Sequence, residues 1–151
     1  MKAVVQIVTT SEVKVEGESV GKISDGLFVL LGVTEEDTKA EAELLARKIC
    51  NLRVFCDEND KMNLSVLDID GSVLVVSNFT LCADTKKGNR PNFMNAARPE
   101  TAEPLYEYFT ECVKQNGVKQ VANGQFGADM KIEARLSGPV TILLDTDTWS
   151  K

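Results

Sequence analysis

The residues best suited to chemistry lie in mid-chain, in the run Ser77-Asn78-Phe79-Thr80. They follow an unbroken aliphatic run, residues 73–76, which is typical of a strand covered on both faces. If the strand continues, Ser77 and Phe79 point to one side while Asn78 and Thr80 point to the other. Such a strand end delivers hydroxyls, amides and main-chain N–H groups to a cleft. From the pattern alone, ordinary strand residues with locally satisfied hydroxyls are the favoured alternative.

The chain contains no histidine. This excludes Ser-His-Asp and Cys-His nucleophile systems and most histidine-based zinc chemistry. Catalysis would therefore need carboxylates, hydroxyls, lysine, main-chain donors or a group on the substrate. The four cysteines form no C-x-x-C pair, so we expect reduced, mostly buried thiols. The acidic turn at residues 57–61 lacks the glycine and distal glutamate of a calcium loop, and we expect neither a metal nor a cofactor.

Three cations, Lys86, Lys87 and Arg90, lie close together in the segment that follows the central run. They could contact phosphates, although a solvated loop is the simpler interpretation. The net charge of −6 argues against a protein that coats nucleic acid non-specifically, and we expect no DNA partner. No apolar run is long enough for a membrane helix and no signal-peptide plan is visible, so we expect a cytoplasmic protein without a membrane partner.

The elements that would position these residues form a single α/β domain, residues 1–151. Valine-rich runs at 3–9, 13–15, 20–23 and 27–33 predict an antiparallel meander, with turns at Glu16-Gly17 and Asp25-Gly26. Asp70-Gly71 gives another hairpin signal before the central strand. A strand at 118–121 and a last pair at 131–136 and 140–144 follow, with Ser137-Gly138-Pro139 predicted as the turn between that pair.

Two helices are also predicted. Thr38 and Glu41 form a capping-box pair, and Ala42, Leu45 and Ile49 begin an apolar stripe at helical spacing. The second helix is expected to begin near Thr101, with Pro104 in its first turn, and to end at Asn116-Gly117.

Three segments together resemble the D-aminoacyl-tRNA deacylase family: Ser77-Asn-Phe-Thr-Leu81, Phe126-Gly-Ala-Asp-Met130 and Ser137-Gly-Pro-Val-Thr141. Further similar segments are Ala3-Val-Val-Gln6, Leu30-Leu-Gly-Val33, Lys61-Met-Asn-Leu-Ser65, Ala83-Asp-Thr85 and residues 88–91. The resemblance implies an enzyme that hydrolyses the ester of D-aminoacyl-tRNA, and of tRNA mischarged with glycine, at the acceptor end. It also implies a homodimer with mainly antiparallel β-sheets packed into a barrel-like core and two main helices outside.

The resemblance assigns a role to each matched residue. Asn78 and Phe79 would offer main-chain N–H groups to the developing oxyanion, in a catalytic segment that includes Ser77. Thr80 would lie beside the scissile ester. The family is described as relying on the 2′-hydroxyl of the terminal ribose, which suits a chain without a histidine to activate Thr80.

The substrate-binding roles are implied in the same way. Gly138-Pro139 matches a Gly-cis-Pro motif that enters from the partner subunit and excludes L-amino acids sterically. Phe126 and Met130 match positions that line the adenosine pocket, although both residue types would also suit a core. Gln6 is assigned to substrate binding as well, and Lys86, Lys87 and Arg90 become candidate tRNA phosphate contacts.

Three positions depart from the family pattern: Asn78 replaces glutamine, Ile7 replaces arginine, and Leu136-Ser137 replaces Asn-x before Gly-Pro. These departures keep three alternatives open. The chain could be a catalytically weak module that binds the tRNA acceptor end, a related deacylase with relaxed chirality, or a small-molecule-binding scaffold without an RNA partner. Measurements of tRNA binding and of deacylation on both enantiomers separate them.

Overall fold

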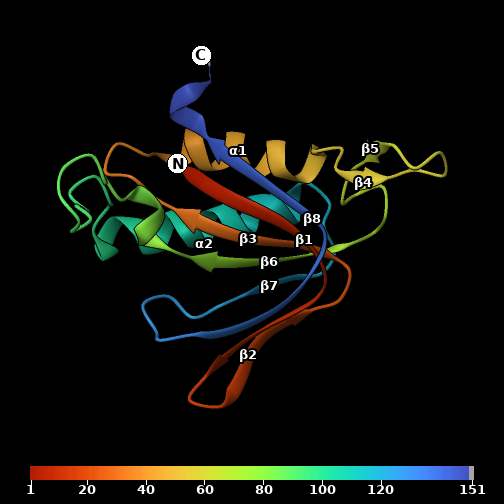
Figure 1. Cartoon of the computed structure of the whole chain (residues 1–151), viewed down its shortest axis with the longest axis horizontal. Coiled ribbons are helices and arrows are strands. Elements are labelled where there is room, and N and C mark those ends of the chain that lie inside the picture. Colours follow the sequence, from red (N-terminus) through yellow and green to blue (C-terminus); the bar gives the residue numbers. More distant parts are fainter. Residues whose placement is uncertain (150–151) are drawn as a thin grey trace.

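The computed structural model describes residues 1–149, which form a twisted sheet with helices on one side (Figure 1). The elements in chain order are β1 (Lys2–Val15), β2 (Glu18–Ile23), β3 (Gly26–Gly32), α1 (Lys39–Asn51), β4 (Phe55–Cys56), β5 (Met62–Leu64), β6 (Ser72–Ser77), η1 (Phe79–Cys82), α2 (Pro99–Gln115), β7 (Val121–Asn123), β8 (Lys131–Asp145) and η2 (Thr146–Thr148). Within residues 1–149, no helix has the length and hydropathy to cross a membrane.

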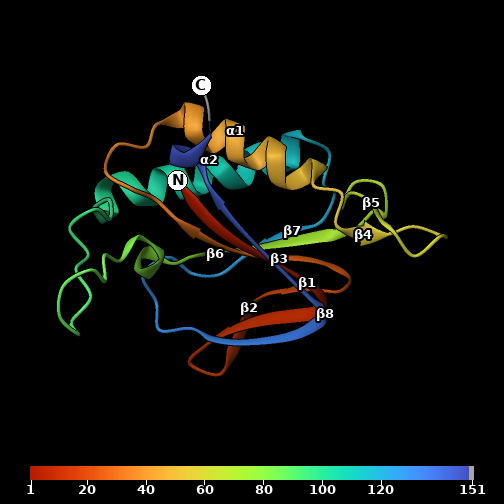
Figure 2. The ribbon, with the colours of Figure 1, turned by 45° about the horizontal axis from the view of Figure 1, so that its top comes forward.

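The main sheet has the order β2-β1-β3-β6-β7, and β8 pairs with β1. The pairs that β1 makes are antiparallel, whereas β3–β6 and β6–β7 are parallel. The main chain of β2 at Gly21 lies against the carbonyl of Asn123 in β7, so the sheet nearly closes on itself. Both helices lie together on one side of it (Figure 2). The predicted α/β class, with a barrel-like core and two outer helices, is confirmed.

The predicted hairpin at Asp25-Gly26 is wrong. Strands β2 and β3 both pair with β1, and the register continues across the break because Ile23 pairs with Ser11 and Gly26 with Val8. A Cβ atom on Gly26 would lie 1.9 Å from the Ser72 carbonyl oxygen, so this glycine permits close approach to β6 and makes no turn. The only tight turn of this segment is Glu16-Gly17, as predicted, with positive φ at both residues.

The predicted turn at Ser137-Gly138-Pro139 is also wrong, because β8 is one strand that pairs with β1 on both sides of this segment. Leu136 pairs with Val8 and Thr141 with Gln6, which leaves a single β1 residue opposite residues 137–140. The four residues therefore form a bulge that projects from the strand.

Two smaller predictions about strands also need correction. Asp70-Gly71 is a tight turn, with Asp70 at φ 53° and the Gly71 N–H donating to the Val66 carbonyl at 2.9 Å. It closes no hairpin, because the following strand β6 pairs in parallel with β3. The strand predicted at 118–121 lies further along the chain, as β7.

The capping box of α1 is confirmed, since Thr38 accepts from the helix backbone and Glu41 accepts from the Thr38 N–H at 2.7 Å. Helix α2 begins earlier than predicted. Pro99 occupies its first turn, where a missing N–H costs nothing, and Pro104 lies inside the helix. Its end at Asn116, followed by Gly117 with φ 112°, agrees with the sequence.

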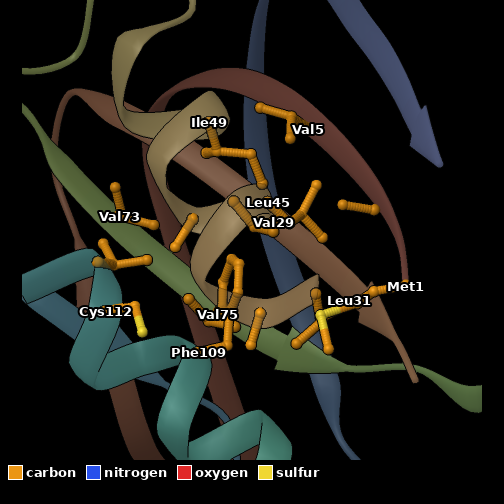
Figure 3. Packing of buried hydrophobic residues seen from close by; sticks show 14 of the residues in the cluster. Met1, Val5, Val29, Leu31, Leu45, Ile49, Val73, Val75, Phe109 and Cys112 are labelled. Carbon is orange, nitrogen blue, oxygen red and sulfur yellow. The ribbon is translucent and has the colours of Figure 1, made fainter. Parts of the chain in front are cut away.

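Strand β6 is buried on both faces, as its unbroken aliphatic run predicts. Val73 and Val75 belong to the core between the sheet and the helices, and Figure 3 shows Val75 close to Phe109 of α2. Leu74 and Val76 belong to a second core on the opposite face. This double burial makes β6 a rigid support for the residues that follow it.

Candidate active site

A cavity of about 600 Å³ opens where β6 ends. Its walls come from the end of β6, η1, the segment before α2, the start of α2 and the loop after β7. The lining residues are Val33, Ser77, Asn78, Phe79, Phe93, Ala96, Ala97, Pro99, Ala102, Phe126, Gly127, Ala128 and Met130. Five of the sequence-predicted site residues thus meet in one cavity: Ser77, Asn78, Phe79, Phe126 and Met130. Phe93 and the alanines were missed, because nothing in their local pattern marks them.

None of these lining side chains is ionisable. Their polar groups are the Ser77 hydroxyl, the Asn78 amide and the main chain. A general acid or base with a tuned pKa is therefore not provided by the walls of this cavity. The cavity suits a reaction that depends on positioned neutral donors and on a group carried by the substrate.

The start of η1 determines which N–H groups at the end of β6 have an acceptor within the chain. The Asn78 N–H donates to the Leu31 carbonyl at 2.8 Å, as a continuation of the β3–β6 ladder. This N–H therefore already has an acceptor in the sheet, and the oxyanion role expected for it stays a prediction. The N–H groups of Phe79 and Thr80 lie in the first turn of a 3-10 helix, which supplies no acceptor for them. The strand alternation predicted beyond Ser77 ends here, because the chain becomes helical at Phe79.

The Thr80 hydroxyl lies next to the cavity without lining it, and donates to the Asn78 amide oxygen at 2.5 Å. A neutral amide oxygen is too weak a base to generate an alkoxide. This contact therefore holds the Thr80 side chain in place and does not activate it as a nucleophile.

Gly32, at the end of β3, allows η1 to lie close to the sheet. A Cβ atom at this position would lie 3.0 Å from the Leu81 Cβ and 3.3 Å from the Asn78 carbonyl oxygen. Glycine is therefore the residue that lets the strand end and η1 approach this closely. The position of the Phe79 and Thr80 N–H groups depends on that approach.

Tyr106 of α2 supports the opposite wall. Its hydroxyl donates to the Val75 carbonyl at 3.1 Å and accepts from the Asn123 side chain at 3.0 Å. Burial raises the pKa of this hydroxyl, which stays protonated as a donor near neutral pH. The Tyr106 ring lies 5.9 Å from that of Phe126, centroid to centroid. This network could not be predicted from the sequence, because a tyrosine beside an apolar helical stripe is also an ordinary core residue.

Lys86, Lys87 and Arg90 are exposed on the loop that leads to Phe93. Asp84 and Asn92 close this loop through two main-chain hydrogen bonds of 2.7 and 2.9 Å. No carboxylate within residues 1–149 forms an ion pair with the three cations. Their charge is therefore presented to solvent at the segment that borders the cavity.

Gly138, Pro139 and Gln6 lie apart from these walls, since none of them lines the cavity of its own chain. The Gly138-Pro139 peptide bond is cis and belongs to the bulge of β8. Gln6 donates from its side chain to the Thr141 hydroxyl at 3.1 Å, across the β1–β8 pair. Ile7, where the family pattern has an arginine, is the β1 residue opposite the bulge.

Comparisons with known proteins agree with this arrangement. The family model described as D-Tyr-tRNA(Tyr) deacylase matches residues 4–145. A D-aminoacyl-tRNA deacylase of Clostridioides difficile is 55% identical over 97% of this chain and 97% of its own length. A Bacillus velezensis protein of the same name is 53% identical over 97% of this chain and 99% of its own length.

Two solved structures share the fold. One, named c-Myc DNA Unwinding Element Binding Protein, is 45% identical and superposes with a TM-score of 0.91 over 96% of this chain and 98% of its own. The other, described as a probable eukaryotic D-amino acid tRNA deacylase, is 15% identical with a TM-score of 0.81 over 95% of this chain and 97% of its own. From the matched family model and the closely similar relatives it follows that this chain belongs to the D-aminoacyl-tRNA deacylase family of hydrolases.

Proposed function

We propose that this protein hydrolyses the ester bond of D-aminoacyl-tRNA and of glycyl-tRNA, releasing the free amino acid and the tRNA. Membership of the deacylase family supports the reaction class. The single structural observation that carries the proposal is the cavity at the end of β6, which has neutral polar groups and no ionisable side chain in its walls. We place the reaction in the cytoplasm, where translation consumes aminoacyl-tRNA.

In the proposed mechanism, the N–H groups of Phe79 and Thr80 donate to the carbonyl oxygen as negative charge develops on it. Removal of one such donor typically costs about a hundredfold or more in rate. The 2′-hydroxyl of the terminal ribose assists the attack of water on the ester carbonyl. The chain itself contains no histidine, and the Thr80 hydroxyl is hydrogen-bonded to a neutral amide. Phe126 and Met130 contact the terminal adenosine, and Ser77 lines the same cavity.

Chiral selection in this proposal requires a second copy of the chain, whose Gly138-Pro139 enters the cavity and excludes L-amino acids. Two observations support a homodimer. Within the described residues β8 pairs only with β1, so one edge of a long strand has no partner. Three large apolar residues on that strand are exposed, namely Ile132, Leu136 and Leu143.

The test is single-turnover deacylation of matched D-Tyr-tRNA, L-Tyr-tRNA and Gly-tRNA, with a Pro139→Ala variant beside the wild type. We expect the wild type to hydrolyse the D and glycyl esters rapidly and to spare the L ester. The Pro139→Ala variant should hydrolyse the L ester faster and so be less selective. Equal hydrolysis of both enantiomers would identify a deacylase with relaxed chirality. Retained tRNA binding without hydrolysis would leave only the binding module.

A D-Tyr-tRNA that ends in 2′-deoxyadenosine tests the mechanism separately. We expect its hydrolysis to be slower by about a hundredfold or more if the 2′-hydroxyl assists the reaction. Equal rates on the ribose and deoxyribose substrates would contradict that part of the mechanism and leave the reaction class intact.

A further inference from the structure

Large apolar side chains are exposed at the rim of the cavity. Phe79 is 56% exposed, Phe93 is 37% exposed and Met94 is 78% exposed. The two phenylalanine rings meet edge to face, with centroids 5.2 Å apart and planes at 74°. Edge-to-face pairs hold each other in place, so the two rings form a fixed aromatic surface that faces solvent.

The size of the cavity indicates what this surface contacts. At about 600 Å³, the cavity falls within the range of sites that enclose one small molecule, roughly 300–1,000 Å³. This is enough for one aminoacylated nucleoside. The rest of an RNA strand must leave the cavity across its rim, where the aromatic pair lies.

The charge beside the pair fits the same ligand. Lys86, Lys87 and Arg90 precede Phe93 on one loop and lack ion-pair partners within residues 1–149. The segment after Phe93 is fixed beside the end of β3, because the Ala97 N–H donates at 2.9 Å to the carbonyl of Val33, the residue after that strand. Aromatic rings next to cations on a fixed support bind single-stranded nucleic acid, with bases stacked on the rings and phosphates near the cations.

We propose that Phe93, held by Phe79, is a stacking subsite for the unpaired base that precedes the terminal nucleoside of the substrate. The inference rests on the proposed function and deepens it by naming a contact beyond the terminal adenosine. Because tRNAs share the terminal trinucleotide CCA, one subsite for the base before the terminal adenosine would serve every tRNA substrate.

The experiment compares two substrates, D-tyrosyl-adenosine and the D-tyrosyl ester of the trinucleotide CCA. We expect the wild type to prefer the trinucleotide ester. Phe93→Ala is expected to lower kcat/KM about tenfold more on the trinucleotide ester than on the adenosine ester, mainly through KM. Phe93→Tyr should retain the preference, whereas Phe93→Leu, apolar but not aromatic, should lose it. Met62→Ala is the matched control, because Met62 is exposed on β5, away from the cavity.

Three results would overturn the subsite. Equal losses of kcat/KM on both esters in Phe93→Ala would show that Phe93 only lines the cavity. A change in the sedimentation of the free protein on Phe93→Ala would mean that a second copy covers the ring. Equal wild-type rates on the two esters would show that no base binds at the rim.

If the wild type hydrolyses neither these two esters nor D-Tyr-tRNA, the deacylase proposal fails but the subsite is still tested. Calorimetry then compares the binding of unesterified CCA and AMP. Tighter binding of CCA that Phe93→Ala abolishes would support the subsite, and equal binding would overturn it.

Discussion

The molecule exposes large apolar side chains in two regions that differ in their surroundings. The rim patch comprises Phe79, Phe93 and Met94, and the β8 patch comprises Ile132, Leu136 and Leu143. The rim patch is carried by a 3-10 helix and a loop, beside a cavity and three cations that form no ion pair within residues 1–149. The β8 patch lies along a long strand, one edge of which has no partner strand among the described residues. Exposure alone therefore does not identify a partner; the backbone and the charge around each patch do.

The largest expected effect comes from placing charge in the β8 patch. The double substitution Leu136→Asp with Leu143→Asp should separate the proposed dimer, because it buries two carboxylates in an apolar contact. The preference for D-Tyr-tRNA over L-Tyr-tRNA should fall by about a hundredfold, since Gly138-Pro139 no longer reaches a neighbouring cavity to exclude the L ester. Sedimentation velocity and single-turnover rates measure the two effects. A monomer that still spares the L ester would refute the role of this patch, and Met62→Asp controls for added charge.

The second prediction concerns the cations beside the rim patch. Alanine at Lys86, Lys87 and Arg90 together should reduce the slope of log K against log salt by about 2 in tRNA binding, at roughly 0.7 per phosphate for single strands. The control replaces Lys114 and Lys119, each of which pairs with a carboxylate, and should leave the slope unchanged. Identical slopes for the triple variant and the wild type would show that the loop is merely solvated.

The third prediction moves η1, which carries Phe79, without changing any residue of the rim patch. Gly32→Ala should shift η1 by a few tenths of an ångström, because the new methyl meets Leu81 and the Asn78 carbonyl. We expect kcat to fall about tenfold with little change in KM, since catalysis is more sensitive to small displacements than binding is. Steady-state kinetics and thermal unfolding measure this. An unchanged kcat would show that η1 tolerates the displacement.

The smallest expected effect lies in the core between the sheet and the helices, where Cys50 of α1 is buried. Burial raises the pKa of the Cys50 thiol to about 12, from an ordinary value of 9.0. The folded state therefore holds this proton more tightly than the unfolded state, so the stability it provides is present below pH 9 and declines as pH rises toward 12. Thermal unfolding of wild type and Cys50→Ala at pH 8, 10 and 11 should show a steeper loss for the wild type. The same loss of stability with pH in both proteins would contradict the raised pKa of Cys50.

The sequence predicted best the features that depend on local pattern. Double burial of residues 73–76 follows from an unbroken aliphatic run, and the capping box at Thr38 follows from residue types three apart. The predicted turns at Asp25-Gly26 and Ser137-Gly138-Pro139 failed for a common reason. Gly26 allows close contact with β6, and Gly138 belongs to a bulge of β8 opposite β1. Both roles depend on a neighbouring strand that the local sequence does not show.

The sequence predicted some of the residues that line the cavity, but not the rest of its walls or the contacts that support them. Ser77, Asn78, Phe79, Phe126 and Met130 were recognised through the family resemblance, and the fold brings them into one cavity. The use of the Asn78 N–H in the sheet was not predictable, because hydrogen-bond partners distant in sequence decide it. Tyr106 and Gly32 were missed for the same reason, since their roles arise from tertiary contacts alone.

The transition from β6 to η1 also has a consequence for amide hydrogen exchange. The Asn78 N–H is bonded within the sheet, whereas the next two amides lie in a helical first turn without an acceptor. Protection from solvent deuterium should therefore drop sharply between Asn78 and Phe79 in the free protein. A ligand whose oxygen accepts from Phe79 and Thr80 should slow exchange at those two amides selectively. Two adjacent residues would thus report occupancy of the reaction centre without any turnover.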